Sequence, residues 1–293
     1  MSQDKLTPYI LLLPIVAHIV VFWLYPFALN VYISFLYWTG LEPLYKAKFV
    51  YLENYRSLLL EDERFWTALR NMAYYALGVP VIIGLGLGLA LLLNQRVRGI
   101  TFFRMSTFAP YITAGVALAL IWQAGLYHPF YGLFNEVLRR LGLPPQPWLR
   151  SPSQALPAIL IHIVWKHLGY IALLFLAGLQ QIPQDYYDAA SVDGASAWDK
   201  FRYVTLPLLR PVILLVLILV TIGALQIFTE PYVMTMGGPA DSTLTLVLYM
   251  YFMAFMYMNM GKAAAMVNIL FAIIFALTIL EIKVLRRSGA YWG

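Results

Sequence analysis

The sequence predicts an all-α, polytopic membrane protein with about six transmembrane helices. Of its 293 residues, 61% are hydrophobic, 16% are aromatic and only 12% are charged, and the mean hydropathy is +0.72. Soluble domains carry about 25% charged residues. The hydrophobic residues also gather in runs that reach the length of about 20 residues that a helix needs to cross a bilayer. Together these observations place the chain in a membrane.

Six apolar runs are long enough to span. The first, 9–37, follows Lys5, but it exceeds the core of a secretory signal peptide and no small-residue cleavage site follows it, so we expect it to remain in the protein. The other five cover approximately 69–94, 102–125, 155–180, 207–235 and 262–285. A shorter stretch, 244–258, is rich in aromatic residues and methionine, which predicts an interfacial or re-entrant helix outside the last span.

The Lys and Arg residues of the short loops favour a cytoplasmic N-terminus, because these residues resist translocation. Six crossings then place the C-terminus on the same side. In this orientation the segments 38–68 and 126–154 lie outside, where we expect small ordered caps. The segment 181–206 lies in the cytoplasm and carries helix and turn signals of its own.

The first part of this cytoplasmic loop predicts a short helix that ends in a tight turn. Pro183 suits the first turn of a helix, and Asp185 and Asp188 then lie near the positive end of the helix dipole. Asp193 and Gly194 supply the turn, because glycine tolerates the left-handed conformation that ends a helix.

The second part of the loop predicts another helix. Ser196 is placed as its N-cap, and Asp199 follows three residues later in a weaker form of the capping box. Pro207 should stop this helix or tilt it into the fifth span. One alternative for the whole loop is an amphipathic segment lying on lipid. Small side chains favour a rigid docking surface instead, because they let another backbone approach closely; these are Ala189, Ala190, Ser191, Gly194, Ala195 and Ser196.

A motif in this loop resembles the EAA loop of ATP-binding-cassette (ABC) importer permeases. That loop has the form Glu-Ala-Ala, three residues, Gly, nine residues, and then a hydrophobic residue, any residue, Leu and Pro. The spacing is matched over its full length by Asp188-Ala189-Ala190-Ser191-Val192-Asp193-Gly194 and Val204-Thr205-Leu206-Pro207. Asp188 departs by one methylene from the glutamate that is usual in the family.

Three further segments, 177–183, 206–211 and 232–239, resemble the carbohydrate-uptake branch of this family. The resemblance implies a pore-forming permease subunit of a binding-protein-dependent importer, which moves a di- or oligosaccharide inward at the expense of ATP. Glycerol phosphate or a related polar metabolite is the alternative cargo. The residues to which the resemblance gives the role of ATPase coupling are Asp185, Asp188, Ala189, Ala190, Asp193, Gly194, Ala195 and Pro207.

The resemblance also implies partners and a location. The partners are a second homologous permease, two cytoplasmic ATPase subunits and an extracytoplasmic solute-binding protein that delivers a small hydrophilic substrate. The location is the plasma (inner) membrane of a bacterium or archaeon, with many passes through the lipid bilayer and both termini cytoplasmic. Residues 1–293 would form a single transmembrane permease domain.

The residues themselves carry no signature of an enzyme, and we expect no catalytic residue. The G-x-x-x-x-G-K-[ST] run that cradles ATP phosphates is missing, so we expect no cofactor on this chain, and ATP with Mg on the partner subunits. There is no cysteine, and His162 and His167 are five residues apart, off a common helix face, so no metal site is expected.

Gly84 and Gly88 lie inside an apolar span and favour close helix packing. The net charge of +6 comes from basic residues placed singly beside apolar runs, which does not predict nucleic-acid binding.

Polar residues inside the spans are candidates for the substrate path, because such residues are costly in lipid and usually face a cavity or a partner helix. Lys166 lies near the middle of the fourth span, at a depth where it can reach Gln226 and Glu230 in the fifth. The hypothesis is that these three line the path with Trp165 and Tyr232, and Asn268 is a weaker candidate. The alternative is a structural ion pair or a lysine that snorkels to the interface.

Two other classes of protein compete with the importer. A secondary transporter or channel would need no ATPase, but such proteins often show paired broken helices or ionisable relays in two repeats, and neither is evident in the sequence. A membrane scaffold without transport activity would leave Lys166 and Glu230 without a reason. The EAA-like loop argues against both.

Overall fold

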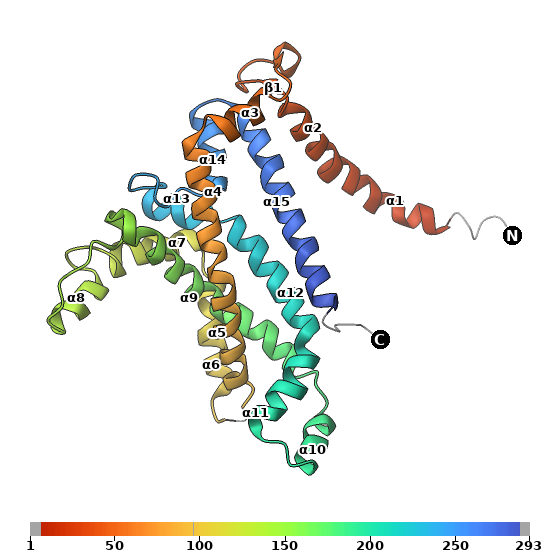
Figure 1. The fold of residues 1–293 in the computed structure, drawn as a ribbon, viewed down its shortest axis with the longest axis vertical. Coiled ribbons are helices and arrows are strands. Elements are labelled where there is room, and N and C mark those ends of the chain that lie inside the picture. The colour runs from red at the N-terminus through yellow and green to blue at the C-terminus, as the bar shows by residue number, and fades with distance from the viewer. Residues whose placement is uncertain (1–6, 96, 288–293) are drawn as a thin grey trace. The chain divides into compact units, whose positions relative to one another are not determined.

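The structure is a computed structural model that describes residues 7–95 and 97–287, and it is mostly helical over them (Figure 1). Lys5, which precedes the first span, lies outside the described residues. The chain divides into two compact units. One unit consists of Met1–Phe65 and Tyr249–Ala272, and the other of Trp66–Leu248 and Ile273–Gly293. The single permease domain expected over the whole chain stays a prediction.

Within the described residues, five helical segments are long and apolar enough to span a membrane. They are Leu11–Ile33, Glu63–Leu93, Pro152–Leu179, Ala197–Thr235 and Met260–Val284. A sixth exists if Ile100–Ile112 and Gly115–Leu126, which meet at an angle of 96°, are counted as one broken span. The predicted all-α fold with about six spans is therefore confirmed.

The predicted span over 102–125 is broken in the structure. The chain forms α6 (Ile100–Ile112), α7 (Gly115–Ile121) and the π-helix η3 (Trp122–Leu126). Pro110 has no amide hydrogen to donate, so it weakens the last turn of α6. Thr113 and Ala114 then take extended conformations, with ψ of 143° and 120°, and the chain leaves in a new direction.

The first unit contains the N-terminal span and a small cap. Its elements include α1 (Thr7–Ile19), η1 (Val20–Leu24), α2 (Tyr25–Ile33), β1 (Leu36–Tyr37), η2 (Leu44–Lys46), β2 (Lys48–Phe49), α3 (Glu53–Leu60) and η6 (Phe252–Met256). The strands pair antiparallel, with Leu36 opposite Phe49. The buried Asn54 donates hydrogen bonds of 2.9 Å to the carbonyls of Ser34 and Leu36, which ties α3 to the first strand. This agrees with the ordered cap predicted for 38–68.

The second unit is built around one long helix, α9. Its elements include α5 (Gly78–Leu93), α8 (Leu133–Arg140), η4 (Trp148–Arg150), α9 (Pro152–Leu179), α10 (Gln184–Val192), α11 (Ala197–Lys200), η5 (Phe201–Thr205), α12 (Leu206–Leu225) and α13 (Thr229–Thr235). Three further helices, α4 (Glu63–Ala76), α14 (Leu246–Tyr251) and α15 (Met260–Arg287), contribute to both units. The core of the second unit joins α5, α9 and α12 through Ile82, Ala90, Leu93, Ile171, Ala172, Phe175, Leu176, Leu179, Leu209 and Val216.

Close packing of α5 on α9 depends on a glycine, but not on the predicted pair. A Cβ added at Gly86 would clash with the side chain of Ile171, whereas one added at Gly84 or Gly88 would meet nothing within 4 Å. The periodicity of the glycine run was insufficient to decide which face of the helix meets α9. Gly86 is therefore the small residue that this contact requires.

The stretch 244–258 forms a helix that is too short to span. It consists of α14 and η6, which cover the apolar segment Leu246–Met256. Leu246 and Leu248 are fully buried. This burial favours a segment held within the protein over one lying on a lipid surface.

Candidate functional site

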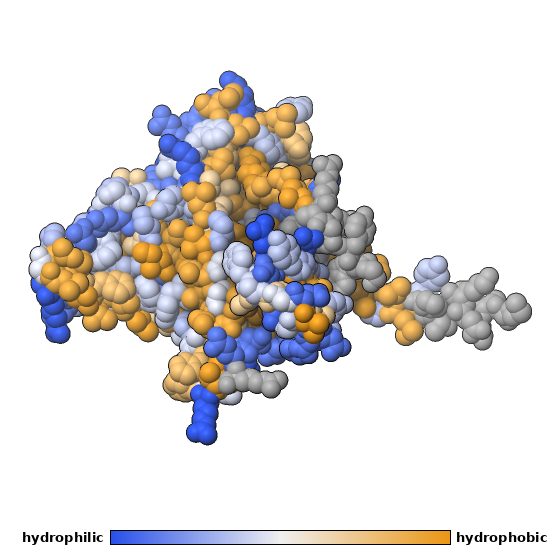
Figure 2. All heavy atoms as spheres, turned by 60° about the horizontal axis from the view of Figure 1, so that its bottom comes forward, coloured by the Kyte–Doolittle hydropathy of each residue, from blue (hydrophilic) through white to orange (hydrophobic). Residues whose placement is uncertain are grey.

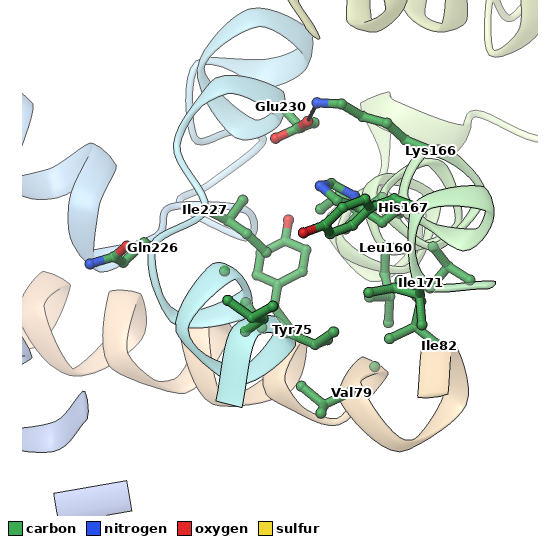
Figure 3. Close-up of a pocket in the computed structure, with 18 of the residues that line it drawn as sticks. Tyr75, Val79, Ile82, Leu160, Lys166, His167, Ile171, Gln226, Ile227 and Glu230 are labelled. Carbon is green, nitrogen blue, oxygen red and sulfur yellow. Dashed lines mark hydrogen bonds and ion pairs between the residues drawn. The ribbon is translucent and has the colours of Figure 1, made fainter. Parts of the chain in front are cut away.

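A cavity of about 380 Å³ lies inside the second unit. This volume is within the range of roughly 300–1,000 Å³ that is usual for small-molecule sites. The residues that line it come from α4, α5, α6, α9, α12 and α13, and its polar and aromatic members are Tyr75, Tyr111, Lys166, His167, Tyr170, Gln226, Phe228, Thr229 and Glu230 (Figure 3). The rest of the lining is largely aliphatic. The cavity thus has an apolar wall with a few polar groups.

The charged groups of the cavity form an ion pair. The Lys166 ammonium lies 2.8 Å from a carboxylate oxygen of Glu230, and the two side chains are only 13% and 7% exposed. Two buried charges tolerate this environment only when they are paired with good geometry. The pair therefore holds α9 against α13 at one wall of the cavity.

A break in the fifth span places Glu230 at this wall. The predicted span over 207–235 is present but interrupted, because α12 ends at Leu225 and α13 begins only at Thr229. A backbone carbonyl freed by such a break needs a partner when it lies at membrane depth. The buried Thr245 supplies one, since its hydroxyl donates a 2.7 Å hydrogen bond to the Ile227 carbonyl.

Three tyrosines and a histidine join the ion pair at the cavity, and sequence reasoning missed all four. The Tyr75 hydroxyl is buried and has no hydrogen-bond partner, and Figure 3 shows it pointing into the space between α12 and α9. The rings of Tyr111 and Tyr170 stack with 4.2 Å between their centroids. His167 also lines the cavity, with Nδ1 2.9 Å from the Ile163 carbonyl oxygen. Tyrosines inside apolar spans were the available signal, because a phenol in such a place usually finds a partner.

The structure brings together only some of the predicted path residues. Lys166, Gln226 and Glu230 all line the cavity, although the Gln226 side chain points away from the pair (Figure 3). Trp165 and Tyr232 do not line it. They pack instead on other aromatic rings, Trp165 on Trp122 at 5.0 Å and Tyr232 on Phe228 at 5.2 Å between centroids.

Asn268 belongs to the first unit, where it has a structural environment of its own. Its side-chain carbonyl accepts a 2.8 Å hydrogen bond from Asn30, and its amide donates one of 2.9 Å to the Tyr55 hydroxyl. These contacts tie α15 to α2 and α3. The amide of Asn268 is therefore already occupied by protein groups.

The predicted helix, turn and second helix are present between α9 and α12. Gly194 has φ of +77°, the left-handed conformation that the turn needs. Ser196 and Asp199 form a complete capping box at the start of α11. The Lys200 ammonium donates a 2.7 Å hydrogen bond to the Ser191 hydroxyl, which ties α11 back to α10. We call α10, the turn and α11 the helical knob.

Two details at the ends of the knob differ from prediction. Pro183 is the N-cap of α10 rather than a residue of its first turn, and Asp188 lies beyond that turn, where its carboxylate accepts a 3.1 Å hydrogen bond from Gln184. Pro207 does not stop the second helix, because α11 continues through the π-helix η5 into α12. The wider π-turn accommodates the proline, since the Leu206 amide donates to the Phe201 carbonyl five residues back.

The knob presents an exposed surface. Of the predicted coupling residues, five are exposed and three are half-buried; the exposed ones are Asp185, Asp188, Ala189, Asp193 and Gly194, and the others are Ala190, Ala195 and Pro207. Three large side chains that the motif did not mark, Tyr186, Val192 and Trp198, are 53%, 88% and 63% exposed. An ordered knob with exposed apolar side chains is a surface suited to contact with another protein.

Several apolar spans, a cavity with a buried ion pair and a helical knob at the end of α9 define a membrane transport component. Residues 67–287 match the family described as "Binding-protein-dependent transport system inner membrane component", and the chain belongs to this family. It is thus a multi-pass inner-membrane permease subunit of an ABC importer and a transport component rather than a catalytic one.

Two relatives show how far the similarity extends. The chain is 38% identical to the sulfoquinovosyl glycerol transport system permease protein SmoG of Agrobacterium fabrum, over 97% of this chain and 92% of the relative. It is 37% identical to the trehalose/maltose transport system permease protein MalF of Thermococcus litoralis, over 95% and 93%. A chain of a bacterial ABC transporter involved in the import of the acidic polysaccharide alginate has the same fold, with a TM-score of 0.83 at 20% identity over 98% of this chain and 97% of that one.

Proposed function

We propose that this chain is one of two homologous permease subunits of a sugar importer and moves a di- or oligosaccharide inward. The support for sugar comes from relatives, which include the lactose transport system permease protein LacF of Rhizobium radiobacter, 37% identical over 87% of this chain and 85% of the relative. An extracytoplasmic binding protein delivers the substrate. Two ATPase subunits, which bind ATP and Mg, provide the energy on the cytoplasmic side, where the knob and both termini lie.

One observation carries the mechanical part of this proposal: two of the helices that line the cavity, α9 and α12, also flank the knob. Lys166 is 13 residues before the end of α9, a distance of about 20 Å along an α-helix. On the other side, α11 runs through η5 into α12 without a break. A push on the knob therefore reaches the cavity through the continuous helix of α11, η5 and α12, and it reaches α9 through the short turn at 180–183. Rigid-body alternation of access requires such a connection.

The chemistry of the cavity favours an uncharged, hydroxyl-rich substrate. Glu230 neutralises the charge of Lys166, which makes the cavity a poor site for the phosphate of glycerol phosphate. The unpartnered Tyr75 hydroxyl offers a donor and an acceptor. The stacked rings of Tyr111 and Tyr170 offer an apolar wall for the carbon face of a sugar.

Uptake by the reconstituted importer tests the proposal. The chain is co-purified with its natural neighbours and incorporated in proteoliposomes with ATP inside and the solute-binding protein outside. Labelled di- and oligosaccharides are compared with labelled glycerol 3-phosphate. ATP-dependent uptake of a sugar supports the proposal, whereas uptake of glycerol 3-phosphate alone, or uptake that needs no ATP, contradicts it.

A further inference from the structure

The segment 127–151 forms an ordered cap between η3 and α9, at the end of α9 opposite the knob. It contains α8 and η4, and the fully buried Asn135 organises it. The Asn135 amide donates to the carbonyls of Pro129 and Gln146 at 3.0 and 2.9 Å. The Asn135 side-chain carbonyl accepts hydrogen bonds from the backbone N–H of Gln146 and the indole N–H of Trp148, both at 2.9 Å. With all four hydrogen bonds made, the cap is a rigid body.

This rigid cap exposes an apolar stripe. Leu133 and Val137 on α8 and Leu141 at its C-cap follow one another at four-residue spacing, so they lie on one side of the helix. They are 56%, 47% and 68% exposed, and Phe130, three residues before Leu133, is 72% exposed. We call these four residues the cap stripe. A surface of this kind on an ordered element needs an apolar partner.

The cap stripe is bordered by groups typical of a membrane interface. Tyr131 is 68% exposed, and its ring is fixed by stacking on His128 with 3.5 Å between centroids. On the polar face of α8, Arg139 and Arg140 each lie 3.0 Å from Glu136. The Arg140 side chain is 78% exposed and long enough to reach lipid phosphates while its methylenes stay on apolar surface.

The position of the cap in the chain argues for lipid as the partner. The cap begins directly after η3 and ends directly before α9, so both of its ends are fixed to segments that enter the membrane. The buried Tyr127 locks this position, because its hydroxyl donates a 2.8 Å hydrogen bond to the Ala158 carbonyl in the second turn of α9. Figure 2 shows the molecule largely from the end that carries α10 and α11. In this view the lobe at the left, which holds α8, presents a broad apolar surface toward the α10–α11 end. That is the side a bilayer crossed by α9 would occupy.

We propose that the cap lies in the headgroup region of the bilayer leaflet opposite the knob, with the cap stripe inserted toward the acyl chains. The occupant of this surface is phospholipid. Amphipathic helices with one apolar face and basic residues on the other bind membranes in this way. The cap then holds the start of α9 at a fixed depth in the membrane. This end of the helix stays in place while the knob moves the opposite end.

Nitroxide labels on single cysteines test the proposal. The sequence has no cysteine, so each label is placed without removing a native one. Val137→Cys reports the cap stripe, and Arg139→Cys, two residues on and about 200° around the helix, is the matched control. The complete importer is labelled in vesicles of phosphatidylethanolamine and phosphatidylglycerol. The accessibility of each label to oxygen, which concentrates in lipid, is compared with its accessibility to a water-soluble nickel complex.

Insertion in lipid predicts that the Val137 label is shifted toward oxygen and the Arg139 label toward nickel. Leu141→Cys should behave as Val137→Cys does, which shows that the result belongs to the stripe and not to one variant. Equal access of nickel to both faces overturns the proposal. So does a Val137 label that is immobile and shielded from both reagents, because the cover is then protein. If that shielding appears only after the solute-binding protein is added, the stripe is a docking surface for that protein instead.

Discussion

Lys166 and Glu230 are 64 residues apart in the sequence, yet their charged groups meet at 2.8 Å at the wall of the cavity. Glu230 reaches this place because α12 breaks after Leu225 and the chain restarts as α13. The pair therefore links the long helix α9 to the segment that follows the break. A contact of this kind contributes both to the stability of the unit and to the electrostatics of the cavity.

Breaking this pair separates the two contributions. Glu230→Gln leaves the Lys166 charge buried and unpaired, which costs about 3–5 kcal/mol, so both the melting temperature and uptake should fall. The double variant Lys166→Met/Glu230→Leu removes both charges and should recover most of the melting temperature but not uptake. Thermal unfolding of the purified complex and proteoliposome uptake measure the two. A double variant with wild-type uptake would show that the pair is structural only.

The Tyr75 hydroxyl should act on substrate and not on folding, because it has no partner in the protein. Tyr75→Phe removes the hydrogen bond that this hydroxyl would make to the sugar, which is worth about 0.5–1.5 kcal/mol. The KM for sugar should therefore rise about 2- to 10-fold, with the melting temperature unchanged or higher. Tyr127→Phe is the matched control, since the Tyr127 hydroxyl bonds to the Ala158 carbonyl. It should lower the melting temperature and leave KM unchanged. The opposite pattern would remove Tyr75 from the path.

The contact of α5 with α9 distinguishes one glycine from its neighbours. Gly86→Ala places a methyl group against Ile171, and overpacking of this kind costs about 1–3 kcal/mol. Gly84→Ala has open space around it and should change stability little. Thermal unfolding of both variants in the same detergent gives the comparison. Equal losses would contradict the close packing of α5 on α9 at Gly86.

The capping box of α11 should matter for coupling more than for assembly. Ser196→Ala removes the side chain that caps α11, a loss of about 0.5–2 kcal/mol, so hydrogen exchange over 197–200 should be faster and ATP-driven uptake should fall. Ser196→Thr keeps the hydroxyl and should behave as the wild type does. Faster exchange without any loss of uptake would mean that a rigid α11 is not needed for coupling.

The sequence predicted the elements whose signals are local. The glycine turn at Gly194 and the capping box at Ser196 depend on residues within a few positions of one another, and both are present. The apolar spans depend on composition over about 20 residues, and in the part of the chain that the structure describes only the span over 102–125 is broken by a bend of 96°. Pro207 was expected either to stop the second helix or to tilt it into the fifth span, and the structure excludes the first outcome. A proline ends a regular α-helix, but the wide turn of η5 before it lets the helix continue.

The cavity was predictable only in part, because it depends on contacts between segments far apart in the chain. The cost of a buried charge was enough to single out Lys166 and Glu230. A tyrosine such as Tyr75 or Tyr111 carries no such desolvation cost when it faces lipid headgroups or a hydrogen-bond partner. The presence of these tyrosines in the sequence was therefore not enough to place them at the site. Asn268 looked similar to the path residues in the sequence, but its neighbours on α2 and α3 already satisfy it.

Substitutions at Gly194 test most directly whether the helical knob binds an ATPase through its ordered turn. Gly194 has φ of +77°, which proline cannot adopt, whereas asparagine tolerates this region. The chain is co-expressed with all its natural neighbours and purified from detergent as wild type, Gly194→Pro and Gly194→Asn. We expect the ATPase to stay with the wild type and Gly194→Asn and to be lost from Gly194→Pro, while the two permeases remain assembled. An ATPase that remains fully bound to Gly194→Pro, or that never binds the wild type, would contradict this expectation.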